Sequence, residues 1–292
     1  MQPLAKRPFS HDPPRASIGE LDLGIAVSGG RSIAKRQFHR QALKIIRPHY
    51  LDDSGQVYYT IINPGGGFVG GDEYRISIEV EAGASALVTD QSATKVYRTP
   101  EDFAVQNIDL RVGDGAVLEY IPDQLILYRD ADFRQQITAD VHENGSLLMS
   151  EIITPGWSPD GGKFLYDLAR LRNVVSVGGE LDLIDNLVLT PKDPVFTSDR
   201  SLYLGGETHV ATLICYDPGI DETMFEQVRE LVAAHRDSAG ELDASVTRTD
   251  RPGFVLRALG QRTEILQSLV LAVADHLRAK LRRQGPINLR KY

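Results

Sequence analysis

The side chains best suited to hold a divalent cation are four carboxylates, Asp72, Asp90, Glu119 and Asp123. A tight transition-metal site would require His or Cys ligands that converge in space. The seven histidines are instead scattered, with no HxH, HxxxH or CxxC pair. The sequence therefore predicts weak cation binding by oxygen ligands and no preformed tight site. At each single position, a structural or solvated carboxylate is the favoured interpretation.

A second polar segment, residues 89–98, directly follows an apolar run and is dense in hydroxyl, amide and charged groups. Polar groups that lie this close to a core satisfy one another or line a cavity. The alternative is a solvated loop. The candidate residues in this segment are Thr89, Gln91, Ser92 and Lys95.

Five glycines within residues 65–71 form a loop that ends at Asp72. A glycine-rich loop can hold phosphate, but no GK[ST] follows these glycines and the loop leads into a strand pattern, so no helix N-terminus is available. A tight structural turn is the favoured interpretation. The glycines assigned to it are Gly65, Gly66, Gly70 and Gly71.

Signatures of nucleophilic catalysis are missing from the sequence. No GxSxG motif occurs, Cys215 has no histidine within five residues, and Ser92 has no base nearby in sequence. The residues alone do not indicate an enzyme. A single cysteine cannot form an intramolecular disulfide, which fits a reducing compartment.

The composition of the chain argues against a nucleic-acid partner, a membrane-spanning protein and a secreted protein. The chain carries 32 basic and 40 acidic side chains, a formal net charge of −8, and no dense Lys/Arg run, which argues against nucleic acid. Its apolar runs, such as 269–274, are far shorter than the roughly 20 residues of a membrane helix. The N-terminus has no apolar signal region. We therefore expect a cytoplasmic protein whose partner is a protein, a cation or a small molecule.

A weak repeat of about 32 residues organises the middle of the chain. Each repeat has two runs rich in Val, Ile and Leu on either side of a glycine, and these glycines are Gly83, Gly115, Gly145 and Gly179. The predicted strand pairs are 75–80 and 84–89, 105–112 and 116–121, 136–141 and 146–152, and 171–177 and 181–189. A lone hairpin cannot bury an apolar face, so we expect a mainly β fold of stacked strand units in layered sheets. Independent hairpins in a sandwich are the alternative.

Two amphipathic helices are predicted near the C-terminus. The first begins after a cap at Asp221, and the second covers residues 263–283. Two strands about the turn at Pro252 and Gly253 separate them. We expect residues 1–17 to be a flexible arm and residues 18–292 to form one domain, with a helix-containing part at about 218–292.

Three consecutive motifs in this order and spacing resemble those of a known family. They are NPGGGFVGGD (63–72), GASALVTDQSATKVYR (83–98) and GAVLEYIPDQLI (115–126). Together they are similar to the urease accessory proteins of the UreD class, also called UreH. The match is specific over about residues 60–130, and weaker agreement covers most of the remaining chain.

The resemblance implies a mostly β, helically stacked fold and a non-catalytic role in urease maturation. Members of the class are understood to bind apo-urease and, with the F accessory protein and the GTPase G accessory protein, to deliver nickel through an internal polar channel. The resemblance therefore implies transient nickel and no tightly bound cofactor.

Individual positions carry over where the motifs match. Asp72 and Glu119 match acidic positions of the family, Thr89, Gln91 and Lys95 match its polar segment, and Asp123 falls in the third motif. We assign Asp72, Glu119 and Asp123 to a weak nickel path. Thr89, Gln91, Ser92 and Lys95 are assigned to channel or loop polar positions. An ammonium cannot coordinate a cation, so Lys95 is expected to pair with a carboxylate.

The segment 155–164 departs from the family pattern. Trp157 stands near the family's arginine and Gly162 near its glutamate, which removes two charged positions, and Asp160 is two residues out of place. Two alternatives stay open, and the altered segment bears on the second of them. One is a β-stack carbohydrate-active enzyme with Asp123 and Asp160 as paired acid and base, and the other is a binding module that has lost nickel handling.

Overall fold

The computed structural model describes residue 9 and residues 18–193, 204–240 and 242–289. The predicted arm, residues 1–17, lies outside the described residues apart from Phe9. The Phe9 ring is 5.1 Å from the guanidinium carbon of Arg170. No described helix is long and apolar enough to cross a membrane.

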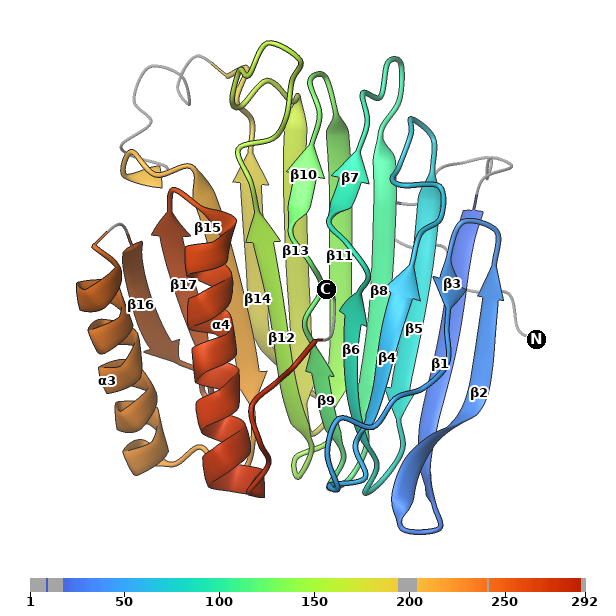
Figure 1. Ribbon diagram of the computed structural model, residues 1–292, viewed down its shortest axis with the longest axis vertical. Helices are drawn as coiled ribbons and strands as arrows, with labels where there is room; N and C mark the ends of the chain where they lie inside the picture. Colours follow the sequence, from blue (N-terminus) through green and yellow to red (C-terminus); the bar gives the residue numbers. More distant parts are fainter. Residues whose placement is uncertain (1–8, 10–17, 194–203, 241, 290–292) are drawn as a thin grey trace.

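Most of the described chain forms two β-sheets that pack face to face, which confirms the predicted mainly β class (Figure 1). Sheet A has the strand order β14-β13-β11-β8-β5-β1-β2. Its strands are β1 (Ile18–Ser28), β2 (Arg31–Arg40), β5 (Glu73–Val80), β8 (Ala104–Val112), β11 (Asp132–Val141), β13 (Leu168–Val177) and β14 (Glu180–Leu189).

Sheet B has the order β16-β17-β15-β12-β9-β6-β4-β3, with β10 and β7 attached beside β12. Its strands are β3 (Lys44–Ile45), β4 (Val57–Ile62), β6 (Ser85–Asp90), β7 (Thr94–Val96), β9 (Val117–Tyr120), β10 (Leu125–Leu127), β12 (Ser146–Ile153), β15 (His209–Tyr216), β16 (Leu242–Arg248) and β17 (Gly253–Gly260).

In the first three predicted glycine repeats, the chain crosses from sheet A to sheet B between the two strands of the unit. β5, β8 and β11 lie in sheet A, their successors β6, β9 and β12 lie in sheet B, and equivalent strands pair in parallel. Gly83 and Gly115 have positive φ at two of these crossings, which glycine adopts without a Cβ clash. The last unit differs, because β13 and β14 pair antiparallel within sheet A. Stacking is thus confirmed, and in the first three units the strands of one unit do not form hairpins.

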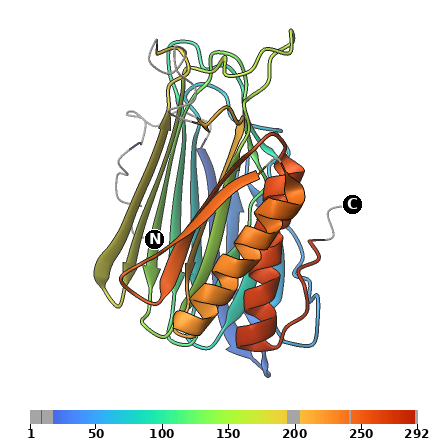
Figure 2. The ribbon, with the colours of Figure 1, turned by 90° about the vertical axis from the view of Figure 1, so that its left-hand side faces the viewer.

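Both predicted helices cover the outer face of sheet B (Figure 2). Helix α3 (Glu222–Ala239) begins where the Asp221 carboxylate accepts a 2.8 Å hydrogen bond from the backbone N–H of Met224. Helix α4 (Thr263–Leu277) continues into a π-helical turn, η1 (Arg278–Arg282). The strands β15, β17 and β16 extend sheet B, so the part from about residue 218 shares that sheet.

Two apolar cores result from this layering. One lies between the sheets and includes Ile78, Leu110 and Ala139, which are neighbours in the register of sheet A. The other lies between sheet B and the helices and includes Leu148 and Leu269. Because side chains alternate along a strand, each residue of sheet B faces one core or the other.

Candidate functional site

Two adjoining pockets interrupt the apolar core between the sheets. The first, here called the loop pocket, is a cavity of about 40 Å³ beside the glycine-rich loop. The second, the inner pocket, is a cavity of about 30 Å³ nearer the middle of the sandwich. They share the lining residues Asp90, Thr94 and Gln106. Each has room for a few water molecules. Polar side chains line both, and the two adjoining pockets are together called the polar passage.

The lining residues occupy positions that would ordinarily be apolar. In β8, Gln106 points to the same side as the core residues Ile108 and Leu110, and in β12, Glu151 follows Leu147 and Met149 in the alternation. Gln106 and Gln135 are also direct neighbours in sheet A. The strand alternation therefore carries these polar groups to the interior.

The glycine-rich loop is joined to β7 at one side of the loop pocket, through a parallel bridge between Phe68 and Val96. The Phe68 N–H donates to the Lys95 carbonyl at 2.8 Å, and the Tyr97 N–H donates to the Phe68 carbonyl at 2.9 Å. A Cβ on Gly67 would lie 2.5 Å from the Lys95 carbonyl oxygen, so only glycine fits there. The Tyr74 hydroxyl donates to the Gly67 carbonyl at 3.3 Å.

Asp72 and its neighbours close this loop. The Val69 N–H donates to the Asp72 carboxylate at 2.9 Å, and the Gly71 N–H donates to the Phe103 carbonyl at 3.0 Å. At the other end of the loop, the Gly65 N–H donates to the Asn63 side chain at 3.1 Å. The structure places Asp72 at the base of the loop and outside the lining of both pockets.

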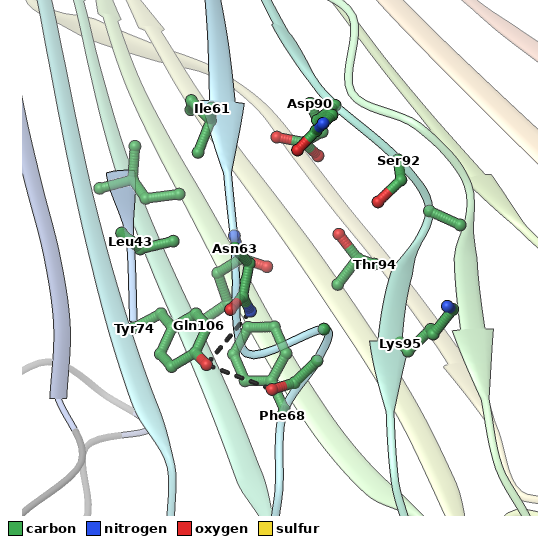
Figure 3. A pocket seen from close by; sticks show the side chains of 15 residues that line it. Leu43, Ile61, Asn63, Phe68, Tyr74, Asp90, Ser92, Thr94, Lys95 and Gln106 are labelled. Carbon is green, nitrogen blue, oxygen red and sulfur yellow. Dashed lines mark hydrogen bonds between the residues drawn. The ribbon is translucent and has the colours of Figure 1, made fainter. Parts of the chain in front are cut away.

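Four of the predicted polar residues line the passage. Gln91, Ser92 and Lys95 line the loop pocket, and Asp123 lines the inner pocket. Ser92 and Thr94 lie across the loop pocket from Asn63 and Tyr74 (Figure 3). In the described part of the chain, no carboxylate forms an ion pair with the Lys95 ammonium. The expected pairing of Lys95 thus stays a prediction.

Glu151 is hydrogen-bonded by two side chains at the inner pocket. One of its carboxylate oxygens accepts a short hydrogen bond from Gln135, and the other accepts one from Asn173 at 2.6 Å. Glu151 lines the inner pocket and is partly exposed, but the surrounding protein desolvates its carboxylate. This desolvation raises the pKa of Glu151 to about 7, despite the hydrogen bond from Asn173. A cation bound nearby would therefore stabilise the ionised form of this carboxylate.

Thr89 and Glu119 lie on the opposite face of sheet B, toward the helices. The Thr89 hydroxyl donates to the Ile121 carbonyl at 2.5 Å. Glu119 is fully buried, ion-paired with Arg278, and accepts a 3.0 Å hydrogen bond from Gln56. The structure does not bring these two residues together with Asp123, and their assigned roles remain untested.

The segment 155–164 is partly exposed, although Ser158 and Phe164 are buried. Asp160 accepts hydrogen bonds from the Ser158 hydroxyl at 2.5 Å and from Arg129, and these contacts hold its pKa below the ordinary value. Trp157 is half exposed and packs on Tyr128, with ring centroids 4.7 Å apart. Because Asp160 lines neither pocket, it does not share a cavity with Asp123.

The sequence argument missed five polar residues that approach one another between the sheets. They are Gln106, Gln135, Glu151, Asn173 and Asp185. A usable signal existed for four of them, because Gln106, Glu151, Asn173 and Asp185 are polar residues at apolar-phase positions of predicted strands. Gln135 lies just before the predicted strand 136–141. In the ranges that the structure describes, no three His, Cys, Asp or Glu side chains are close enough together to hold one metal ion. The oxygen groups are instead spread along the passage.

Comparison with known proteins places these features in context. The sequence profile of the UreD urease accessory protein family matches residues 17–291. The urease accessory protein UreD of Paenarthrobacter aurescens (strain TC1) is 44% identical over 278 residues, which cover 94% of this chain and 95% of the relative. That of Arthrobacter sp. (strain FB24) is 46% identical over 280 residues, 94% of both chains. That of Corynebacterium glutamicum (strain R) is 44% identical over 283 residues, 94% of this chain and 98% of the relative.

Proposed function

The chain belongs to the UreD family of urease accessory proteins, and from this membership we propose that it delivers nickel to apo-urease. In this proposal it acts in the cytoplasm as a non-catalytic chaperone, together with the F accessory protein and the GTPase G accessory protein. Nickel is the cargo of the complex and is bound only in passing.

The observation that carries the proposal is the polar passage between the sheets. Asp90, Asp123 and Glu151 offer carboxylate oxygens along the two adjoining pockets. Oxygen ligands bind Ni²⁺ less tightly than imidazole or thiolate and exchange it more readily. A series of such groups supports transfer of an ion, since no single position gathers enough ligands to retain it.

Deletion of the gene for this protein in its host tests the role in maturation. We expect urease activity and the nickel content of purified urease to fall to background, while the urease subunits are still made. Reintroducing the gene should restore both. Normal nickel content in urease from the deletion strain would contradict the proposal.

A pull-down tests the proposed partners separately. The tagged full chain should retain the F accessory protein and urease, and the G accessory protein should follow when F is present. A matched strain without F distinguishes direct from indirect capture of G. If neither F nor urease is retained, then this protein does not work through the proposed complex.

A further inference from the structure

A row of polar side chains crosses the inner face of sheet B beyond the inner pocket. Glu151 on β12, Thr212 on β15, Arg257 on β17 and Ser245 on β16 are successive neighbours in the strand register. Apolar core residues flank the row, as Val210 and Ile214 do on either side of Thr212. The row ends at an open groove between β14 and β16, which Arg257 and Ser245 line. Arg257 thus lies between the inner pocket and the groove.

Two residues of sheet A face this row. Asn173 and Asp185 are neighbours on β13 and β14. Arg257 joins the two sheets, because its guanidinium donates to the Asp185 carboxylate at 2.5 Å and to the Thr212 hydroxyl at 2.7 Å. Asn173 donates to Glu151 at 2.6 Å, and its Nδ2 is 3.5 Å from the second oxygen of Asp185.

The same group of residues contains an acceptor that the fold leaves unused. Asn173 is only 1% exposed, and its side-chain carbonyl has no hydrogen-bond partner among the described residues. Glu151, Asp185 and Asn173 therefore supply oxygens that a hard divalent cation could use. One positive charge, that of Arg257, already stands beside them.

The chemistry of arginine determines what this charge does. A guanidinium stays protonated, donates hydrogen bonds only and cannot coordinate a metal ion. Arg257 neutralises Asp185 and repels a second cation in a partly buried region where charges interact strongly. Without it, Asp185 and Glu151 would both be available to the same ion.

We propose that Arg257 sets the affinity of the passage for divalent cations, keeping it low enough for the ion to be released. This inference rests on the proposed function, since only a protein that hands nickel on needs weak binding. Arg257 is a positioning residue in this account, because it acts through Asp185 and its own charge and does not touch the ion.

Titration of the full chain with Ni²⁺, followed by calorimetry at fixed pH and ionic strength, tests the inference. We expect Arg257→Gln to bind Ni²⁺ at least about tenfold more tightly than the unmodified protein. Arg257→Lys, which keeps the charge, should remain close to the unmodified protein. In cells, Arg257→Gln should yield urease with less nickel, because the ion is retained.

Arg257→Gln alone leaves the partly buried Asp185 carboxylate without its ion-pair partner. A second pair of variants therefore also removes the Asp185 charge. Asp185→Asn together with Arg257→Gln should bind Ni²⁺ more tightly than Asp185→Asn alone. Equal affinities in both comparisons, with binding still weakened by Glu151→Gln, would overturn the role of Arg257 and leave the nickel passage standing. If Glu151→Gln also leaves binding unchanged, both the role of Arg257 and the passage are wrong.

Discussion

Replacing Arg278 by methionine is expected to lower the free energy of unfolding by about 3–5 kcal/mol, because the buried Glu119 carboxylate loses its close partner and keeps only the longer contact with Arg282, at 3.7 Å. Arg278 is 1% exposed and Glu119 is fully buried. Arg278 also donates to Gln56 at 2.8 Å and to the Gly285 carbonyl at 3.0 Å, so it ties the C-terminal turn to sheet B. Urea unfolding of the full chain measures the loss.

A double-mutant cycle separates the ion pair from the other contacts of Arg278. Glu119→Gln with Arg278→Met should be less destabilised than the sum of the two single variants, because neither charge is then left alone. If Arg278→Met costs less than about 1 kcal/mol, the pair is not structural. Glu119 would then be free for the nickel role that the family resemblance suggests.

Nickel binding is expected to strengthen with rising pH up to about pH 7 and then to level off. The Glu151 carboxyl has an ordinary pKa of 4.5 and a folded pKa of about 7, so below pH 7 a proton must leave before Ni²⁺ can bind. One displaced proton corresponds to about a tenfold change in affinity per pH unit. Asp90 and Asp123 in the inner pocket, and Asp185 and Arg257 beside it, are the charged groups that face Glu151.

Calorimetric titrations with Ni²⁺ at pH 6, 7 and 8 check this dependence. Glu151→Gln should flatten it, whereas Asp140→Asn, on the exposed outer face of sheet A, should leave it intact. The same raised pKa makes the folded state bind more protons than the unfolded state between about pH 4.5 and 7. The contribution of Glu151 to stability therefore declines as the pH rises through that window. A pH dependence that survives in Glu151→Gln would exclude Glu151 as its source.

The strands and helices could be predicted from the sequence because the patterns that indicate them are local. The alternation in residues 75–80 and the Asp221 cap each depend on a few neighbouring residues. The path of the chain at Gly83 and Gly115 was not accessible, because a glycine turn looks the same in a hairpin and in a crossing between sheets. Only the parallel pairing of β5 with β8, in which Glu73 is opposite Val105, distinguishes the two.

Only part of the candidate site could be predicted from the sequence, because some contacts join residues that are distant along the chain. Asp123, Gln91, Ser92 and Lys95 line the two pockets, and their assigned roles stay predictions. Glu119 could not be placed, because its partner Arg278 is distant in sequence and lies in the turn after α4. The only sign of Glu151 in the sequence is a charged residue at an apolar position of its strand. Its hydrogen bond with Asn173, which comes from the facing sheet, could not be predicted from the sequence.

The most direct test of the central claim is the nickel content of urease purified from the deletion strain carrying variants of this protein at matched levels. We expect several-fold less nickel per urease active site with Glu151→Gln than with the unmodified protein. Asp140→Asn, a matched loss of one carboxylate outside the passage, should support full nickel content. Full nickel content with a folded Glu151→Gln would contradict transfer through the interior between the sheets.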